Sequence, residues 1–72
     1  MKKLKKIKIR VNGKIKTIID KLTLYKLINE LKIPITKVAI ELNKKILDKN
    51  RLNKIKINKN DKIEIVHFIG GG

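Results

Sequence analysis

The sequence predicts an α+β fold, in which a mixed sheet of four to five strands carries one main helix packed on one face. Two observations support this fold class. Apolar and polar residues alternate at both the beginning and the end of the chain, which is the pattern of half-buried strands. A single stretch between them places its apolar residues at helical spacing instead. A chain of 72 residues is also short enough to form one small domain with one core.

The chain begins with a predicted β-hairpin. The alternation over residues 4–11 gives the first strand, with Ile7, Ile9 and Val11 on one face. The pair Asn12-Gly13 follows, and it favours a type I′ turn, because both central residues of that turn need a positive φ. The second strand is expected over residues 14–19, where one face is formed by Ile15, Thr17 and Ile19.

A short helix is expected after the hairpin. Thr23 is a suitable N-cap, because its hydroxyl can accept a hydrogen bond from a backbone N–H of the first turn. The stripe that follows has the spacing of one helix face and consists of Leu24, Leu27, Ile28 and Leu31. This helix of about nine residues is expected to end at Pro34, since the residue before a proline avoids the helical region.

The second half of the chain predicts further extended segments. A third strand is expected over residues 37–42, and a short fourth strand at residues 46–47. Residues 48–54 are expected to form a polar connection anchored by Leu52, and residues 55–57 a further extended piece. The last strand is expected over residues 62–68, after a turn rich in Asn and Asp.

The order of these elements predicts the topology. One helix and one small sheet must bury their apolar faces against each other, so the helix should lie across one face of the sheet. The first and last strands are expected to be parallel, central neighbours. This arrangement is the β-grasp, or ubiquitin-like, fold. It is expected to span residues 1–72 as a single domain, with residues 69–72 as a flexible tail.

The formal net charge of +14, from 20 Lys and Arg against 6 Asp and Glu, is typical of a nucleic-acid-binding module. Three features weigh against that function. The lysines are spread over every predicted element, arginine occurs only as Arg10 and Arg51, and aromatic residues make up 3% of the chain. We interpret most of the lysines as residues at solvated positions. The second interpretation is that they form a docking face for an acidic partner.

Neither a catalytic site nor a metal site is expected. The chain has no cysteine, its one histidine is His67, and its acidic residues are scattered without metal-ligand spacing. No apolar run approaches the roughly 18 residues that span a bilayer, and no secretory signal follows the basic N-terminus. A membrane partner is not expected. The expected location is the cytoplasm, or the stroma of a plastid that encodes the protein.

Three of the four glycines of the chain are its last three residues. Glycine has no Cβ, so such a segment adds no packing but can enter a narrow site on another protein. We interpret the carboxylate of Gly72 as the functional group of the protein. Gly70 and Gly71 are then the thread that carries it into the partner.

The residues before the glycines predict a contact surface. Ile63 and Ile65 continue the buried phase of the last strand, whereas Val66 and Phe68 are out of phase with them. We therefore expect Val66 and Phe68 on the open face of the sheet, where they form an apolar partner-contact patch with Ile69.

Four segments resemble the ThiS family, the sulfur-carrier proteins of thiazole formation in thiamine biosynthesis. The end of the chain, residues 62–72, is similar to the C-terminal signature of that family. Three internal segments resemble its VAVEVNG strand and turn, its KDGD turn and its VNGK hairpin; they are residues 38–43, 58–62 and 9–14. Two residues depart from the pattern, because Lys44 and Asn60 stand where the family usually has glycine.

The resemblance implies a chemistry for Gly72. A ThiF-type adenylating enzyme would use ATP with Mg to couple the carboxylate to AMP, which creates a good leaving group. Persulfide sulfur from a cysteine desulfurase or a sulfur relay protein would then displace AMP and leave a thiocarboxylate. A ThiG-type thiazole synthase would accept that sulfur. The protein itself would bind no cofactor and would be a co-substrate rather than an enzyme.

Two alternatives stay open from the sequence. A small subunit of molybdopterin synthase, or a sulfur carrier that is a protein modifier, also ends in Gly-Gly and would use the same terminal chemistry. The alternative from another class is the basic nucleic-acid-binding module, for which the charge is the one argument.

Overall fold

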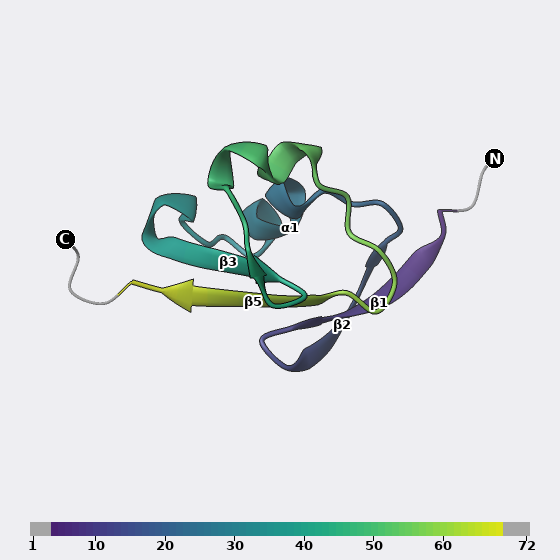
Figure 1. Cartoon of the computed structure of the whole chain (residues 1–72). Coiled ribbons are helices and arrows are strands. Elements are labelled where there is room, and N and C mark those ends of the chain that lie inside the picture. The colour runs from purple at the N-terminus through teal and green to yellow at the C-terminus, as the bar shows by residue number, and fades with distance from the viewer. Residues whose placement is uncertain (1–3, 69–72) are drawn as a thin grey trace.

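The computed structural model describes residues 4–68, which form a five-stranded mixed sheet with one α-helix and two 3₁₀-helices (Figure 1). The elements in chain order are β1 (Lys6–Val11), β2 (Lys14–Ile19), α1 (Leu24–Glu30), η1 (Ile35–Lys37), β3 (Val38–Leu42), β4 (Lys45–Ile46), η2 (Lys49–Lys54) and β5 (Lys62–His67). The strand order is β2-β1-β5-β3-β4, with β1 and β5 parallel and the other pairs antiparallel. The predicted β-grasp fold is confirmed.

One apolar core lies between the sheet and the two helices α1 and η2, which Figure 1 shows on the same side of the sheet. The helices contribute Leu24, Leu27, Ile28 and Leu52, all fully buried. The sheet contributes the in-phase residues of its strands, which are Ile7, Ile9, Ile18, Val38, Ile40, Ile63 and Ile65. The other face of the sheet, which we call the outer face, carries no helix among the described residues.

The predicted phase of β2 is wrong. Ile18 is buried in the core, whereas Ile15 and Ile19 are 62% and 41% exposed and Thr17 is also exposed. The cause is the two-residue turn at Asn12 (φ 51°) and Gly13 (φ 81°), which fixes Ile7 opposite Ile18. Residues directly opposite in an antiparallel pair share a face, so Ile18 must follow Ile7 into the core.

The helix is shorter than predicted, and Pro34 is not what ends it. Leu31 is already the C-cap, and Lys32 has a positive φ of 58°. The Ile33 N–H donates back to the Ile28 carbonyl over 3.2 Å, which completes a Schellman motif. The N-cap prediction is confirmed, since the Thr23 hydroxyl accepts from the Lys26 N–H over 3.2 Å.

The turn between β3 and β4 repeats the geometry of the first hairpin. Asn43 and Lys44 both have a positive φ, of 52° and 73°, and they connect Leu42 to its partner Lys45. The Asn43-Lys44 pair thus stands in the conformation that Asn12-Gly13 adopts. Glycine takes this conformation without strain, but lysine carries a Cβ that crowds the following carbonyl.

Replacing Lys44 with glycine is therefore expected to stabilise the fold, by about 0.5–1 kcal/mol after the greater freedom of glycine in the unfolded chain is deducted. The thermal unfolding midpoint, followed by circular dichroism, should rise by about 2–8 °C. Lys45→Gly is the matched control, because it removes the same charge but places glycine inside β4, and it should lower the midpoint. A lower midpoint for Lys44→Gly than for the wild type would contradict the strain at this residue.

Residues 48–54 are more ordered than the predicted polar connection. The Asp48 side chain caps η2 by accepting from the Asn50 N–H over 2.9 Å, and Leu52 is the buried anchor that the sequence predicts. The extended piece expected at residues 55–57 is reduced to an isolated β-bridge between Lys56 and Thr23. Ile57 is nevertheless fully buried. Leu52 and Ile57 thus belong to the same core as the buried residues of α1.

Candidate functional site

β5 occupies the centre of the sheet and leads toward the glycine segment of the sequence. It pairs with β3 along five residues, but with β1 only at its beginning, where Arg10 lies opposite Lys62 and Val11 opposite Ile63. Where β1 ends, the Asn12 side chain continues the contact, because its Oδ1 accepts from the Ile65 N–H over 2.7 Å. The sequence indicates the turn at Asn12 but gives no sign of this long-range hydrogen bond.

The beginning of β5 is fixed by a second asparagine. Asn43 accepts from the Lys62 N–H through Oδ1 over 2.9 Å and donates from Nδ2 to the Asp61 carboxylate over 3.1 Å. Asp61, which is 9% exposed, also accepts from the Asn58 N–H over 2.7 Å. Asp61 lies in the Asn- and Asp-rich turn that the sequence predicts before the last strand, and its buried carboxylate is satisfied by two hydrogen bonds. One asparagine from each turn therefore anchors the central strand.

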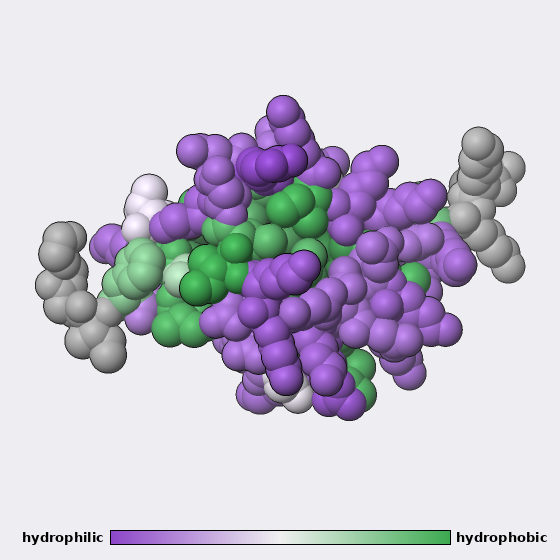
Figure 2. Space-filling model, viewed as in Figure 1, coloured by the Kyte–Doolittle hydropathy of each residue, from purple (hydrophilic) through white to green (hydrophobic). Residues whose placement is uncertain are grey.

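The other end of β5 presents apolar side chains to solvent. Val66 is 51% exposed and lies opposite Ala39 on the outer face, and Phe68, directly after the strand, is 56% exposed. Figure 2 shows apolar surface that extends to the end at which the described chain stops. The predicted exposure of both side chains is confirmed, whereas their contact with a partner stays a prediction.

Phe68 contacts its own domain through both its main chain and its ring. Its N–H donates to the Lys37 carbonyl over 2.9 Å, which adds one backbone hydrogen bond beyond the last residue of β5. The Lys49 ammonium, from η2 on the helix side of the sheet, lies 5.1 Å from the centroid of the Phe68 ring. The ring therefore contacts a side chain that comes from η2, a contact that the sequence did not predict.

The other predicted site residues lie outside the described residues. These are Ile69 of the contact patch, Gly70 and Gly71 of the thread, and Gly72 with its carboxylate. The expected flexible tail, residues 69–72, lies there as well. The structure thus describes the base from which this segment begins.

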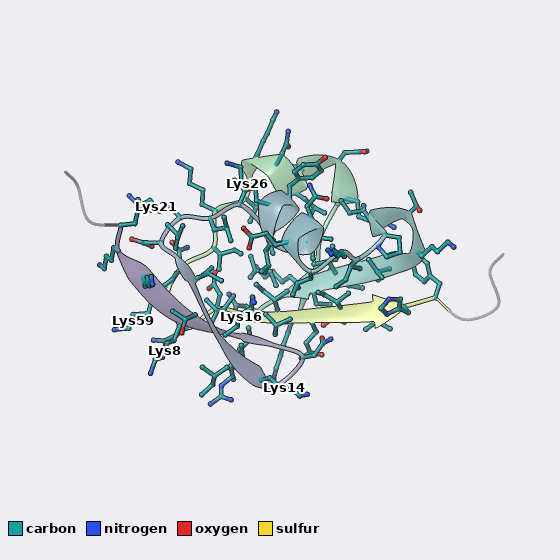
Figure 3. All side chains as sticks on the ribbon, turned by 180° about the vertical axis from the view of Figure 1, so that it is seen from behind. Lys8, Lys14, Lys16, Lys21, Lys26 and Lys59 are labelled. Atoms are coloured by element: carbon teal, nitrogen blue, oxygen red, sulfur yellow. The ribbon has the colours of Figure 1, made fainter. Side chains whose placement is uncertain are left out.

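The positive charge is distributed over the molecule. Figure 3 shows labelled lysines on the hairpin, around α1 and in the turn before β5; they are Lys8, Lys14, Lys16, Lys21, Lys26 and Lys59. Shallow surface hollows lie along β1 and β2, and one of about 240 Å³ is lined by Lys8, Arg10, Ile15 and Lys62. Since lysine side chains reach solvent from separate elements, the charge does not define one compact site.

Within residues 4–68 no group of three His, Cys, Asp or Glu side chains is placed to hold a metal ion. His67 ends β5 and is exposed. The helices in the same part of the chain are all too short to span a bilayer.

A small β-grasp domain whose central strand leads, past exposed apolar side chains, into a glycine segment belongs to the ubiquitin-like carrier proteins. A comparison with protein families makes this more specific, because the model described as the ThiS family matches residues 9–72. The chain belongs to the ThiS family. Members of this family are sulfur carriers, and relatives of the chain are named for that role and for thiamine biosynthesis.

Individual relatives agree with the family. The chain is 43% identical over 56 residues to the sulfur carrier protein ThiS of Bacillus subtilis, a match that covers 78% of this chain and 76% of the relative. It is 38% identical over 66 residues to a thiazole synthase of Paramagnetospirillum magneticum, which covers 92% of this chain but only 20% of that protein. The chain thus spans about a fifth of the latter relative's length.

A solved structure has the same fold. The crystal structure of thiamine biosynthesis protein ThiS from Geobacter metallireducens superposes with a TM-score of 0.81 at 29% identity. The match covers 92% of this chain and all of that one.

Proposed function

We propose that the protein carries sulfur as a thiocarboxylate on Gly72 and delivers it to a thiazole synthase. The observation that carries the proposal is the position of β5. This central strand is anchored at its beginning by Asn43 and at its middle by Asn12. Exposed Val66 and Phe68 lie near its end, and the glycine segment begins two residues after Phe68. The part of the domain that the structure describes is thus a base for the segment that would react.

The chemistry takes place in partner enzymes. A carboxylate is ionised at neutral pH and resists nucleophiles, so an adenylating enzyme must first convert it to an acyl adenylate with Mg and ATP, releasing pyrophosphate. Terminal sulfur of a persulfide then attacks the acyl carbon and AMP leaves. A thiol cleaves the resulting acyl disulfide and is itself oxidised to a disulfide, and Gly72 keeps the sulfur as a thiocarboxylate.

The glycines suit this route for a steric reason. Gly70 and Gly71 have no side chain, so the last residues can follow a narrow channel to the adenylate site. In extended conformation, three residues reach roughly 10 Å beyond Ile69. Val66, Phe68 and Ile69 would then dock on the partner surface around the channel entrance, where exposed apolar side chains gain by burial.

Thiazole synthase as the acceptor is supported by one comparison. The segment of Paramagnetospirillum magneticum that resembles this chain is a fifth of a protein named thiazole synthase, so carrier-like sequence and the remainder share one polypeptide there. Fusion in one protein is consistent with a contact between two proteins in another. The adenylating enzyme and the sulfur source are proposed from the resemblance to the ThiS family and from the chemistry of the carboxylate.

The proposal is tested by intact-mass spectrometry. The purified chain is incubated with Mg-ATP, a ThiF-type adenylating enzyme, a cysteine desulfurase, cysteine and a thiol. We expect a mass gain of about 16 Da, the difference between sulfur and oxygen, which is reversed on addition of thiazole synthase and its substrates. Omission of ATP is the control. An unchanged mass with an enzyme that loads a known ThiS protein would remove the proposal.

A further inference from the structure

Lys49 differs from the other lysines of residues 4–68, because its ammonium donates to carbonyl groups of the protein. It donates to the Ile35 carbonyl over 3.1 Å and to the Val38 carbonyl over 2.8 Å. The same ammonium lies 5.1 Å from the centroid of the Phe68 ring. Two of its three N–H donors are thus occupied internally, while a third side meets the ring.

These contacts join four parts of the fold. Lys49 is the first residue of η2, Ile35 belongs to η1, Val38 begins β3, and Phe68 follows β5. Phe68 is held a second time through its backbone, whose N–H donates to the Lys37 carbonyl over 2.9 Å. Phe68 is therefore held at both its ring and its main chain, although its side chain is more than half exposed.

The carbonyl hydrogen bonds should strengthen the cation–π contact between Lys49 and the Phe68 ring. Hydrogen bonds from a charged donor are stronger than those between neutral groups, so they hold the ammonium in one place. Lys49 is partly buried, and a cation–π contact gains strength as the cation loses water. A cation that is already fixed also loses little additional freedom when a ring settles against it.

We propose that Lys49 is a positioning residue, which holds Phe68 so that the following segment leaves the domain from a fixed point and in a fixed direction. It also leaves the opposite side of the ring free for an apolar pocket on the adenylating enzyme. This inference rests on the proposed function. A different role is a purely structural one, in which Lys49 joins η2 to β3 and its proximity to Phe68 has no consequence for partners.

The experiment compares three variants with the wild type. Lys49→Met removes the ammonium but keeps a flexible side chain of similar length, and Lys49→Arg keeps the positive charge and the donors. Lys54→Met is the matched control, since Lys54 is exposed at the other end of η2 and its replacement removes the same charge. Two readouts are used: the heteronuclear NOE of the Phe68 amide, and KM and kcat for pyrophosphate release by the adenylating enzyme.

For Lys49→Met we expect a lower NOE at Phe68 and a KM raised about three- to tenfold, the size expected for one cation–π contact, with kcat unchanged. Lys49→Arg should recover most of both values, and Lys54→Met should match the wild type. A wild-type KM in Lys49→Met would overturn the proposal, and so would an equal rise in Lys54→Met, since that would be a general effect of charge.

Two further outcomes are also decisive. If the enzyme does not act on the wild-type chain, the proposed function fails, while an unchanged NOE at Phe68 in Lys49→Met would overturn the positioning role by itself. If Lys49→Met does not fold, Phe68→Leu takes its place, because it removes the ring and leaves both carbonyl hydrogen bonds intact. A raised KM is expected for Phe68→Leu, and a wild-type KM would contradict the proposal.

Discussion

Addition of one alanine after Gly72 is expected to abolish sulfur loading without changing the fold. The extension converts the Gly72 carboxylate into a peptide carbonyl, which cannot form an acyl adenylate. The new terminal carboxylate carries a methyl group on its α-carbon, in a channel proposed to admit glycine only. The mass gain of about 16 Da should therefore disappear, a loss of at least a hundredfold in the rate of loading.

The control is one alanine inserted after Met1, at the other end of the chain. This variant has the same mass as the C-terminal extension and should be loaded like the wild type. Circular dichroism should give the same unfolding midpoint for both variants, because neither change touches the core between the sheet and α1. Normal loading of the C-terminal extension would show that the reacting group is not the Gly72 carboxylate.

Ile63→Ala is expected to lower the stability of the fold strongly. Ile63 is fully buried in the central strand, and truncation of a buried isoleucine to alanine costs roughly 2–5 kcal/mol through lost burial and the cavity left behind. A domain of this size has a total stability of only about 4–11 kcal/mol. The free energy of unfolding in urea should fall by about half, and the thermal midpoint by about 10–30 °C.

Val66→Ala in the same strand is the matched comparison. Val66 is 51% exposed on the outer face, so its replacement should change the free energy of unfolding by less than about 1 kcal/mol. The difference between the two variants measures directly which phase of β5 faces the core. Equal losses at both positions would contradict the assignment of Val66 to the surface and with it the proposed partner contact.

Local sequence determined the elements whose signals do not depend on the rest of the chain. The Asn12-Gly13 turn, the Thr23 cap, the buried stripe of α1 and the in-phase residues of β1 and β5 are as predicted. The turn and the cap follow from the backbone conformation and hydrogen bonding of single residues, whereas in the helix and the two strands one arrangement buries the apolar side chains. The order of these elements, with parallel first and last strands, then leaves the β-grasp fold.

The phase of β2 shows where a local pattern is not sufficient. Its sequence has isoleucines in both phases, with Ile15 and Ile19 in one and Ile18 in the other. Periodicity alone therefore favoured the larger set, which proved to be the exposed one. The register set by the two-residue turn decides the buried phase of β2, because it places Ile18 opposite Ile7.

The same distinction between local sequence and tertiary contacts applies to the candidate site. The sequence by itself determined the glycine segment, the family pattern and the exposed phase of Val66, because each is a property of consecutive residues. Only the tertiary structure decided that Lys49 meets Phe68 and that Asn12 and Asn43 hold β5, contacts that join residues 19, 53 and 19 positions apart. A polar side chain does not reveal its distant partner through periodicity, since its hydrogen bond forms only after the strands have paired.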